Sequence, residues 1–222
     1  MRTALLAGIA SICLSFSAHA TQITAFGQTS QTNTITATDN GTTSTTIVTN
    51  GTGADVLIDQ LFGVTTPPAI AGFFSLTATS IDAAVTGFGA IIQHYAGTFC
   101  LTSAASCGGT NELSGTFSDA AFGLNGGTQL SINVANPPDT LSLTSSVIPA
   151  ADLVAPSSFT LSMSNLGALS INGSTIAPFT ASFSGVANAT TVATPEPASL
   201  ALLGVGLLGL GVVAQRRRTN AH

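Results

Sequence analysis

The sequence predicts an all-β body, an antiparallel β-sandwich similar to a jelly roll, between two apolar chain ends. Several stretches alternate apolar and polar residues, which is the pattern of half-buried strands. Turn-forming Asn-Gly pairs lie before, between and after these stretches, at residues 40–41, 50–51, 125–126 and 172–173. No fixed-period repeat is visible, as a solenoid would usually show. Many short strands with such turns favour a sandwich of one domain, residues 21–186.

The first strands are expected in a threonine-rich stretch. Ten of the 21 residues between Thr32 and Thr52 are Thr. β-branched side chains favour strands, although this composition is also typical of a disordered or O-glycosylated stalk. We favour strands because Ile35, Ile47 and Val48 interrupt the stretch and Asn-Gly pairs supply turns.

Later strands are predicted by alternation. Apolar side chains recur at every second position from Leu130 to Val134, from Phe159 to Met163 and from Phe179 to Phe183. We expect the stretch from Leu113 to Ala121 to pair with that from Thr128 to Ala135 as a hairpin. The eleven Phe residues of the body are most simply its core.

Two segments of the body fall outside the strand pattern. Residues 149–154 indicate a short helical turn. Residues 187–194 lack apolar alternation and precede Pro195, so we expect them to form a linker.

Cys100 and Cys107 are expected to form a disulfide in an oxidising compartment, closing an eight-residue loop after a strand that ends at Cys100. Two free thiols or a metal pair are the alternative. With His94 they would give three ligands, one fewer than a structural zinc site uses. Cys13 lies in the segment that we expect to be removed.

The charge balance excludes nucleic acid as a partner. All four Arg residues are at position 2 or at positions 216–218, the chain has no Lys, and the body has eight carboxylates. Binding nucleic acid requires cations that neutralise phosphates. Salt bridges with Lys or Arg are also impossible within the body.

We expect no enzymatic activity. A Ser-His-Asp hydrolase would have to use His94, the one histidine of the body, and no G-x-S-x-G turn is present. A glycosidase would need paired carboxylates, for which Glu112 and Asp119 are candidates, and aromatic residues for stacking, but Trp is absent and Tyr95 is the one Tyr. A secreted hydrolase remains an alternative, to be tested by substituting His94 or Glu112.

Another alternative is a module that binds calcium or polysaccharide. Asp39, Asp55 and Asp59 offer oxygen ligands in predicted loops. No D-x-D-x-D-G loop occurs, and acidic residues are common in turns for conformational reasons alone. These three residues are weak calcium candidates, and no other cofactor or metal is expected.

The N-terminus is typical of a secretory signal peptide, residues 1–20. Arg2 precedes an apolar run, and Ala18 and Ala20 form an A-x-A cleavage site. We therefore expect export by the Sec machinery and a mature chain that begins at Thr21.

The C-terminus combines three features in order. Pro195, Glu196 and Pro197 precede seventeen uncharged residues, 198–214, which as a helix would span about 25 Å of a membrane. The basic residues Arg216, Arg217 and Arg218 follow, and would keep residues 219–222 in the cytoplasm. A plain membrane anchor is the alternative explanation.

This tail, residues 195–218, resembles that of PEP-CTERM proteins, which are exported bacterial proteins processed by a membrane enzyme called exosortase. The resemblance implies that Pro195, Glu196 and Pro197 are the recognition motif and Arg216 to Arg218 the stop. It also implies a Gram-negative host, a transient inner-membrane anchor, release to the cell surface or matrix, and an association with exopolysaccharide and biofilm. The leading interpretation is a non-enzymatic structural or adhesive matrix protein.

Overall fold

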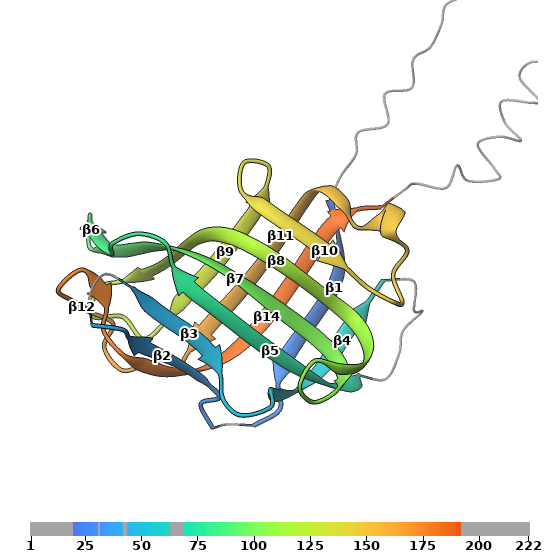
Figure 1. The fold of residues 1–222 in the computed structure, drawn as a ribbon, viewed down its shortest axis with the longest axis horizontal. Coiled ribbons are helices and arrows are strands. Elements are labelled where there is room, and N and C mark those ends of the chain that lie inside the picture. Colours follow the sequence, from blue (N-terminus) through green and yellow to red (C-terminus); the bar gives the residue numbers. More distant parts are fainter. Residues whose placement is uncertain (1–19, 31, 42–43, 63–68, 192–222) are drawn as a thin grey trace, which may run out of the picture. The chain divides into compact units, whose positions relative to one another are not determined.

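The computed structural model describes residues 20–191, apart from residues 31, 42–43 and 63–68. Antiparallel strands dominate the described part of the chain, so the all-β prediction is confirmed (Figure 1). Among the described residues, no helix is long and apolar enough to cross a membrane. The predicted membrane segment, residues 198–214, lies outside the described residues, as do the predicted signal peptide up to His19 and the whole sorting tail.

The strands follow one another along the chain with short connections. Their bounds are β1 (Ala20–Gln28), β2 (Ile35–Asp39), β3 (Thr45–Thr49), β4 (Ala54–Leu61), β5 (Ile70–Ser80), β6 (Val85–Gly87), β7 (Ala90–Ala104), β8 (Gly108–Leu124), β9 (Leu130–Asn136), β10 (Thr140–Thr144), β11 (Val154–Ser164), β12 (Ile171–Asn172), β13 (Thr175–Ile176) and β14 (Phe179–Thr190). A 3-10 helix, η1 (Ala150–Asp152), lies within the segment where the sequence predicts a helical turn.

Twelve of the strands form one sheet that closes on itself. Its last strand, β14, pairs with its first strand, β1, so that Ala20 lies opposite Thr190. Three long strands each pair along one edge with two short strands placed end to end. Thus β14 pairs with β1 and β2, β5 with β4 and β3, and β8 with β9 and β10. The strands β12 and β13 form a separate small hairpin.

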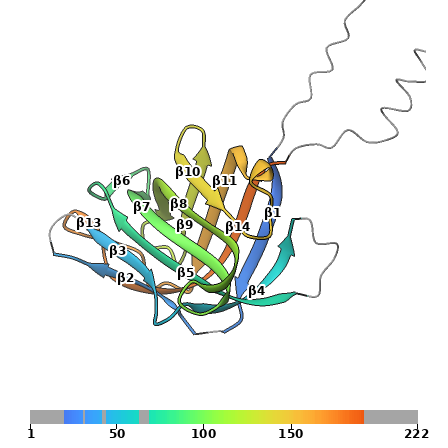
Figure 2. The same cartoon turned by 45° about the vertical axis from the view of Figure 1, so that its right-hand side comes forward.

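The predicted β-sandwich, which would have two separate sheets, is not what the structure has, because one sheet forms both walls. The wall formed by β5, β7 and β8 faces the wall formed by β11 and β14, as the layers of a sandwich would (Figures 1 and 2). However, hydrogen-bonded strands connect these walls on both sides. Alternation shows which face of a strand is buried but not which strands are its neighbours, so it could not distinguish the two arrangements.

The core lies between the facing walls and follows the predicted alternation. Leu130, Ile132 and Val134 are buried, as are the alternate residues from Phe159 to Met163. Six Phe rings pack together across the interior, and the rings of Phe99 and Phe159 are stacked with centroids 4.1 Å apart. These rings belong to Phe26, Phe74, Phe99, Phe117, Phe159 and Phe183. Phe88 departs from the prediction, because it lies fully exposed in the β6–β7 turn.

Two other element predictions are confirmed. The threonine-rich stretch forms β2 and β3, which pair with each other from Ile35 opposite Thr49 to Asp39 opposite Thr45. The hairpin of β8 with β9 also forms, although its pairing extends only from Ala120 to Gly123. The preceding residues of β8, from Ser114 to Ser118, pair with β10 instead.

Two predicted boundaries were wrong. The strand that was expected to end at Cys100 continues as β7 to Ala104. β14 continues to Thr190, so residues 187–190 belong to the sheet and not to the linker. In β14 the buried residues Ala187 and Ala189 alternate with polar ones, and a signal carried by small alanine side chains is weak in the sequence.

One polar cluster is buried at the end of the core near β6 and β13. The Tyr95 hydroxyl donates a hydrogen bond of 2.9 Å to Gln93 Oε1, and Gln93 Nε2 donates to the Asp82 carbonyl oxygen. Burial raises the pKa of the Tyr95 hydroxyl well above its usual value. The one Tyr of the chain is therefore a structural residue and not a surface for ligand stacking.

Candidate functional site: a hydroxyl-lined groove on the outer face

The disulfide between Cys100 and Cys107 shapes the outer face of the β7–β8 hairpin. The two Cα atoms are 5.8 Å apart, and the predicted bond is confirmed. Cys100 is on β7 and pairs with Ser114, whereas Cys107 lies in the turn after β7. Ser106 and Cys107 have positive φ angles of 58° and 55°, so the turn bends sharply where the bond forms.

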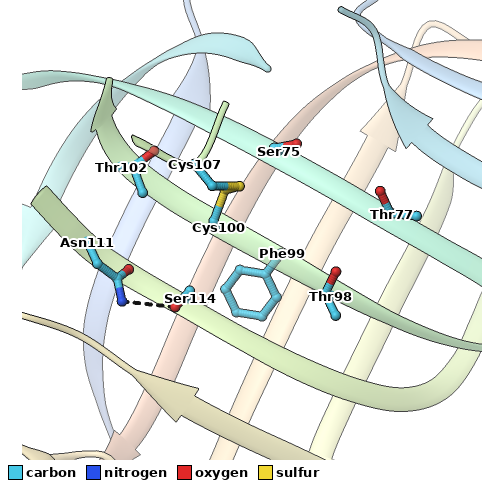
Figure 3. Close-up of a pocket in the computed structure, with 9 residues that line it drawn as sticks. All are labelled: Ser75, Thr77, Thr98, Phe99, Cys100, Thr102, Cys107, Asn111 and Ser114. Carbon is cyan, nitrogen blue, oxygen red and sulfur yellow. Dashed lines mark hydrogen bonds between the residues drawn. A yellow bond between two sulfur atoms is a disulfide. The ribbon is translucent and has the colours of Figure 1, made fainter. Parts of the chain in front are cut away.

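A groove with a volume of about 390 Å³ lies beside this disulfide. Figure 3 shows that hydroxyl and amide side chains of β5, β7 and β8 surround it. Its lining residues are Ser75, Thr77, Thr98, Phe99, Cys100, Thr102, Cys107, Asn111 and Ser114. No Asp, Glu, Lys, Arg or His is among these described lining residues, so the groove is uncharged.

A second hollow, of about 260 Å³, continues the groove toward β10. Both are lined by Thr98, Phe99 and Ser114. The second is also lined by Thr116, Ser142 and Thr144. Together the two hollows extend over the outer face from β5 to β10.

The register of these strands arranges the outward-facing residues in three rows. The middle row runs from Thr77 through Thr98 and Thr116 to Ser142. One flanking row contains Ser75, Cys100, Ser114 and Thr144, and the other contains Thr79, Ala96, Ser118 and Thr140. Ten of these twelve positions carry a hydroxyl group, the exceptions being Ala96 and Cys100. We call the ten hydroxyl-bearing residues the hydroxyl grid.

Most hydroxyls of the grid make no hydrogen bond with other described residues. This is true of Thr77, Thr98 and Thr116, which are exposed to solvent. The hydroxyls that do have partners are near the disulfide end, where Ser114 Oγ and Thr144 Oγ1 are 2.9 Å apart. The centre of the grid therefore offers donors and acceptors that are not engaged within the described structure.

The outer face of the opposite wall is also polar, but several of its side chains bond to one another. Asn33 Nδ2 donates a hydrogen bond of 3.0 Å to Thr180 Oγ1, and Ser182 Oγ donates one of 3.0 Å to Asn33 Oδ1. Asn188 Nδ2 donates another of 3.0 Å to Ser158 Oγ. These groups partly satisfy each other, whereas Ser162 and Ser184 on the same wall have no hydrogen-bond partner among the described residues.

Asn111 adds an unsatisfied acceptor to the wall of the groove. Its Nδ2 atom donates a hydrogen bond of 2.9 Å to Ser114 Oγ. Its Oδ1 atom is buried and has no hydrogen-bond partner among the described residues. A buried acceptor of this kind costs about 1–3 kcal/mol unless a donor reaches it.

The structure does not bring the calcium candidates together. Asp39 ends β2, where its carboxylate accepts hydrogen bonds from the Gly41 N–H and from Asn172 Nδ2. The Gly41 N–H is the main reason that the pKa of Asp39 is lowered. Asp55 and Asp59 are exposed on β4, a strand that does not pair with β2. No group of three His, Cys, Asp or Glu side chains suited to a metal is found among the described residues.

The hydrolase candidates also lie apart. His94 is on the outer face of β7, where its Nδ1 atom contacts Asp82 Oδ2, and both side chains are about half exposed. Glu112 is near the start of β8, whereas His94 lies opposite the far end of that strand. Burial raises the pKa of the Glu112 carboxyl group. No Ser hydroxyl is bonded to His94 in the described part of the chain, so the geometry of a catalytic triad is not assembled there.

The grid is not recognisable in the sequence. The outward residues Ser75, Thr77 and Thr79 alternate with apolar ones, which is a visible signal for a half-buried strand. Their alignment with Thr98 and Thr116 depends on strand partners and register, and the sequence did not specify either.

Of the predicted processing residues, Ala20 is described. It begins β1 and pairs with Thr190. Ala18, the motif Pro195, Glu196 and Pro197, and the basic stop Arg216, Arg217 and Arg218 all lie outside the described residues. Their roles therefore rest on the sequence alone.

Comparison with known proteins identifies this tail but not the body. No curated protein and no solved structure matches the chain. Residues 193–218 match the PEP-CTERM protein-sorting motif, which confirms the resemblance of the tail and implies that the protein is exported and processed by an exosortase.

Proposed function

We propose that the protein is a non-enzymatic structural or adhesive component of an extracellular exopolysaccharide or biofilm matrix. An exosortase-like membrane protease would cut it near Pro195 to Pro197. In this proposal the Sec machinery exports the chain, the tail holds it briefly in the inner membrane of a Gram-negative bacterium, and the body is released to the cell surface or matrix. The observation that carries the proposal is the sorting motif, which begins at residue 193, three residues after the last strand of the body.

The described body is consistent with a non-enzymatic role. The hydrolase candidates His94 and Glu112 lie apart, and the groove is lined by hydroxyls, an amide, a disulfide and a Phe. Such groups can hydrogen-bond a ligand but supply no general acid or base near neutral pH. A hydrolase is therefore the less favoured alternative.

Polysaccharide binding is a second candidate, and the groove favours it. The groove and its neighbouring hollow cross several strands, and their uncharged polar lining suits a polymer rich in hydroxyls. No comparable arrangement of carboxylates supports calcium binding among the described residues.

The sorting proposal is tested by the intact mass of the protein recovered from the medium and outer surface of its native host. We expect a species that begins at Thr21, ends near Pro195 to Pro197 and is two hydrogens lighter because of the disulfide. Replacing Pro195, Glu196 and Pro197 together by Ala should keep the protein in the membrane fraction with its C-terminus intact, because the protease loses its recognition motif.

A matched control variant changes two residues beyond the basic stop, Thr219→Ala with Asn220→Ala, and should be released normally. Recovery of the unaltered protein with Arg218 and His222 still attached would contradict the sorting proposal and favour a plain membrane anchor.

A further inference from the structure

We propose that the hydroxyl grid is a binding site for an uncharged polysaccharide that lies across β5, β7, β8 and β10. This inference deepens the polysaccharide-binding part of the proposed function and rests on it. It assigns a location, a chemical class of ligand and a direction of binding.

The chemistry of the grid selects an uncharged ligand. The twelve outward positions of the three rows carry no charge, and the body as a whole has eight carboxylates and no Lys or Arg. An anionic polymer would be repelled by the negative body and would find no cation to pair with. An uncharged sugar needs partners that both donate and accept, and a Ser or Thr hydroxyl does both.

The geometry of the grid favours a polymer over a single sugar. Adjacent strands are about 4.8 Å apart, so a chain crossing them along the middle row meets a hydroxyl at each strand. One hydrogen bond exchanged with water contributes only about 0.5–1.5 kcal/mol, which is too little to hold a monosaccharide. Repeated contacts along one chain add together, because the first contact places the next sugar near the next hydroxyl.

The hollow shape of the face distinguishes the grid from a merely solvated face. The hydroxyls at the centre of the grid are free of partners among the described residues, but so are those of Ser162 and Ser184 on the opposite wall. The face of the grid is hollowed along the path of the middle row, and Asn111, whose Nδ2 atom donates to Ser114 Oγ, lines this hollow.

The disulfide contributes to the shape of this site. Cys107 lines one end of the groove because its bond to Cys100 holds the β7–β8 turn against the outer face. The grid therefore has a fixed border at this end.

The test uses affinity electrophoresis of the released protein, or of the full-length chain in detergent if release does not occur. The gels contain dextran as a neutral probe, alginate as an anionic probe or no polymer. We expect dextran to retard the protein, alginate to leave it unaffected, and free glucose at the same mass concentration not to compete.

Substitutions then locate the site. The double variant Thr98→Val with Thr116→Val keeps the shape of two directly opposed side chains and removes their hydroxyls, so the dissociation constant for dextran should rise about tenfold or more. Thr98→Ser with Thr116→Ser restores the hydroxyls and should bind nearly as the unaltered protein does. A matched control, Ser162→Ala with Ser184→Ala, removes two directly opposed hydroxyls from the other wall and should bind dextran normally.

The proposal would be overturned by binding that survives the Val variant, by equal loss in the control variant, by retardation in alginate alone, or by no retardation in dextran. Adsorption to ice with no retention by dextran would also overturn it, since a hydroxyl array could instead order water.

Circular dichroism of each variant separates loss of binding from loss of folding. Release is scored separately by mass, so a protein that is released but does not bind, or binds but is not released, shows which proposal has failed.

Discussion

At the scale of single residues, Gly185 shows how closely a ring on one strand packs over the neighbouring strand. Gly185 lies on β14 directly opposite Phe26 of β1. A Cβ atom at this position would be 2.2 Å from Cζ of the Phe26 ring, which is far inside van der Waals contact. The missing side chain thus leaves the space that the Phe26 ring occupies in the core.

Gly185→Ala is expected to destabilise the body by about 1–3 kcal/mol, because the Phe26 ring must shift within a packed core. Gly27→Ala is the matched control, since Gly27 is on the neighbouring strand and a Cβ there would meet no atom within 4 Å. Urea unfolding followed by circular dichroism gives both free energies. Equal stability of the two variants would contradict the packing described for this position.

At the scale of elements, the β7–β8 hairpin depends on the disulfide at its end. These two strands pair over nearly their whole length, from Ala90 opposite Leu124 to Ala104 opposite Gly108. The register shifts near Thr102, and the turn that follows contains Ser106 and Cys107 with positive φ angles. The disulfide secures this irregular end, where regular pairing cannot.

Replacing Cys100 and Cys107 together by Ala should lower the free energy of unfolding by about 2.5 kcal/mol, the loop-closure entropy of an eight-residue loop. The melting temperature should fall by roughly 5–10 °C. If the disulfide also borders the groove, dextran retardation should weaken more than it does in a variant of equal stability, such as Gly185→Ala. Unchanged stability would mean that strand pairing alone holds the turn.

At the scale of the whole molecule, stability is expected to respond to pH and salt in an unusual direction. The body has eight carboxylates, which repel one another, and no Lys or Arg with which they could form salt bridges. Protonating the carboxylates at low pH therefore relieves repulsion without breaking salt bridges of this kind. The raised pKa of Glu112 means that the folded state holds its proton more tightly than the unfolded chain does. Its contribution to stability is therefore present at low pH and is lost as the pH rises through the folded pKa. Asp39, with a lowered pKa, contributes in the opposite sense, and its contribution is lost only under stronger acid.

We therefore expect the urea midpoint to be higher at about pH 4.5 than at about pH 7.5. At the higher pH, raising NaCl from about 0.01 M to about 0.15 M should increase the free energy of unfolding by an amount on the order of 1 kcal/mol, because salt screens the repulsion. Glu112→Gln should reduce the dependence on pH. A midpoint that falls on acidification over this range would show that carboxylate hydrogen bonds outweigh repulsion.

The sequence predicted the components of this molecule better than their assembly. Alternation identified the buried residues from Leu130 to Val134, and Cys100 and Cys107 were paired correctly, because both are local properties. The single closed sheet and the grid could not be predicted, since Thr77, Thr98 and Thr116 become neighbours only through long-range register. The sorting tail was recognisable because its motif, apolar span and basic residues are contiguous in the chain.

The pairing of β1 with β14 has a consequence for biosynthesis. β14 is the last strand of the body to be made, yet β1, β2 and β11 all require it as a partner. Until β14 is available, each of these three strands has one edge without its hydrogen-bonding partner. Unpaired strand edges promote aggregation. Closure of the sheet is thus coupled to the arrival of the sorting signal, which follows β14 by three residues. If translation stopped before Phe179, the chain would lack both β14, which closes the sheet, and the sorting motif.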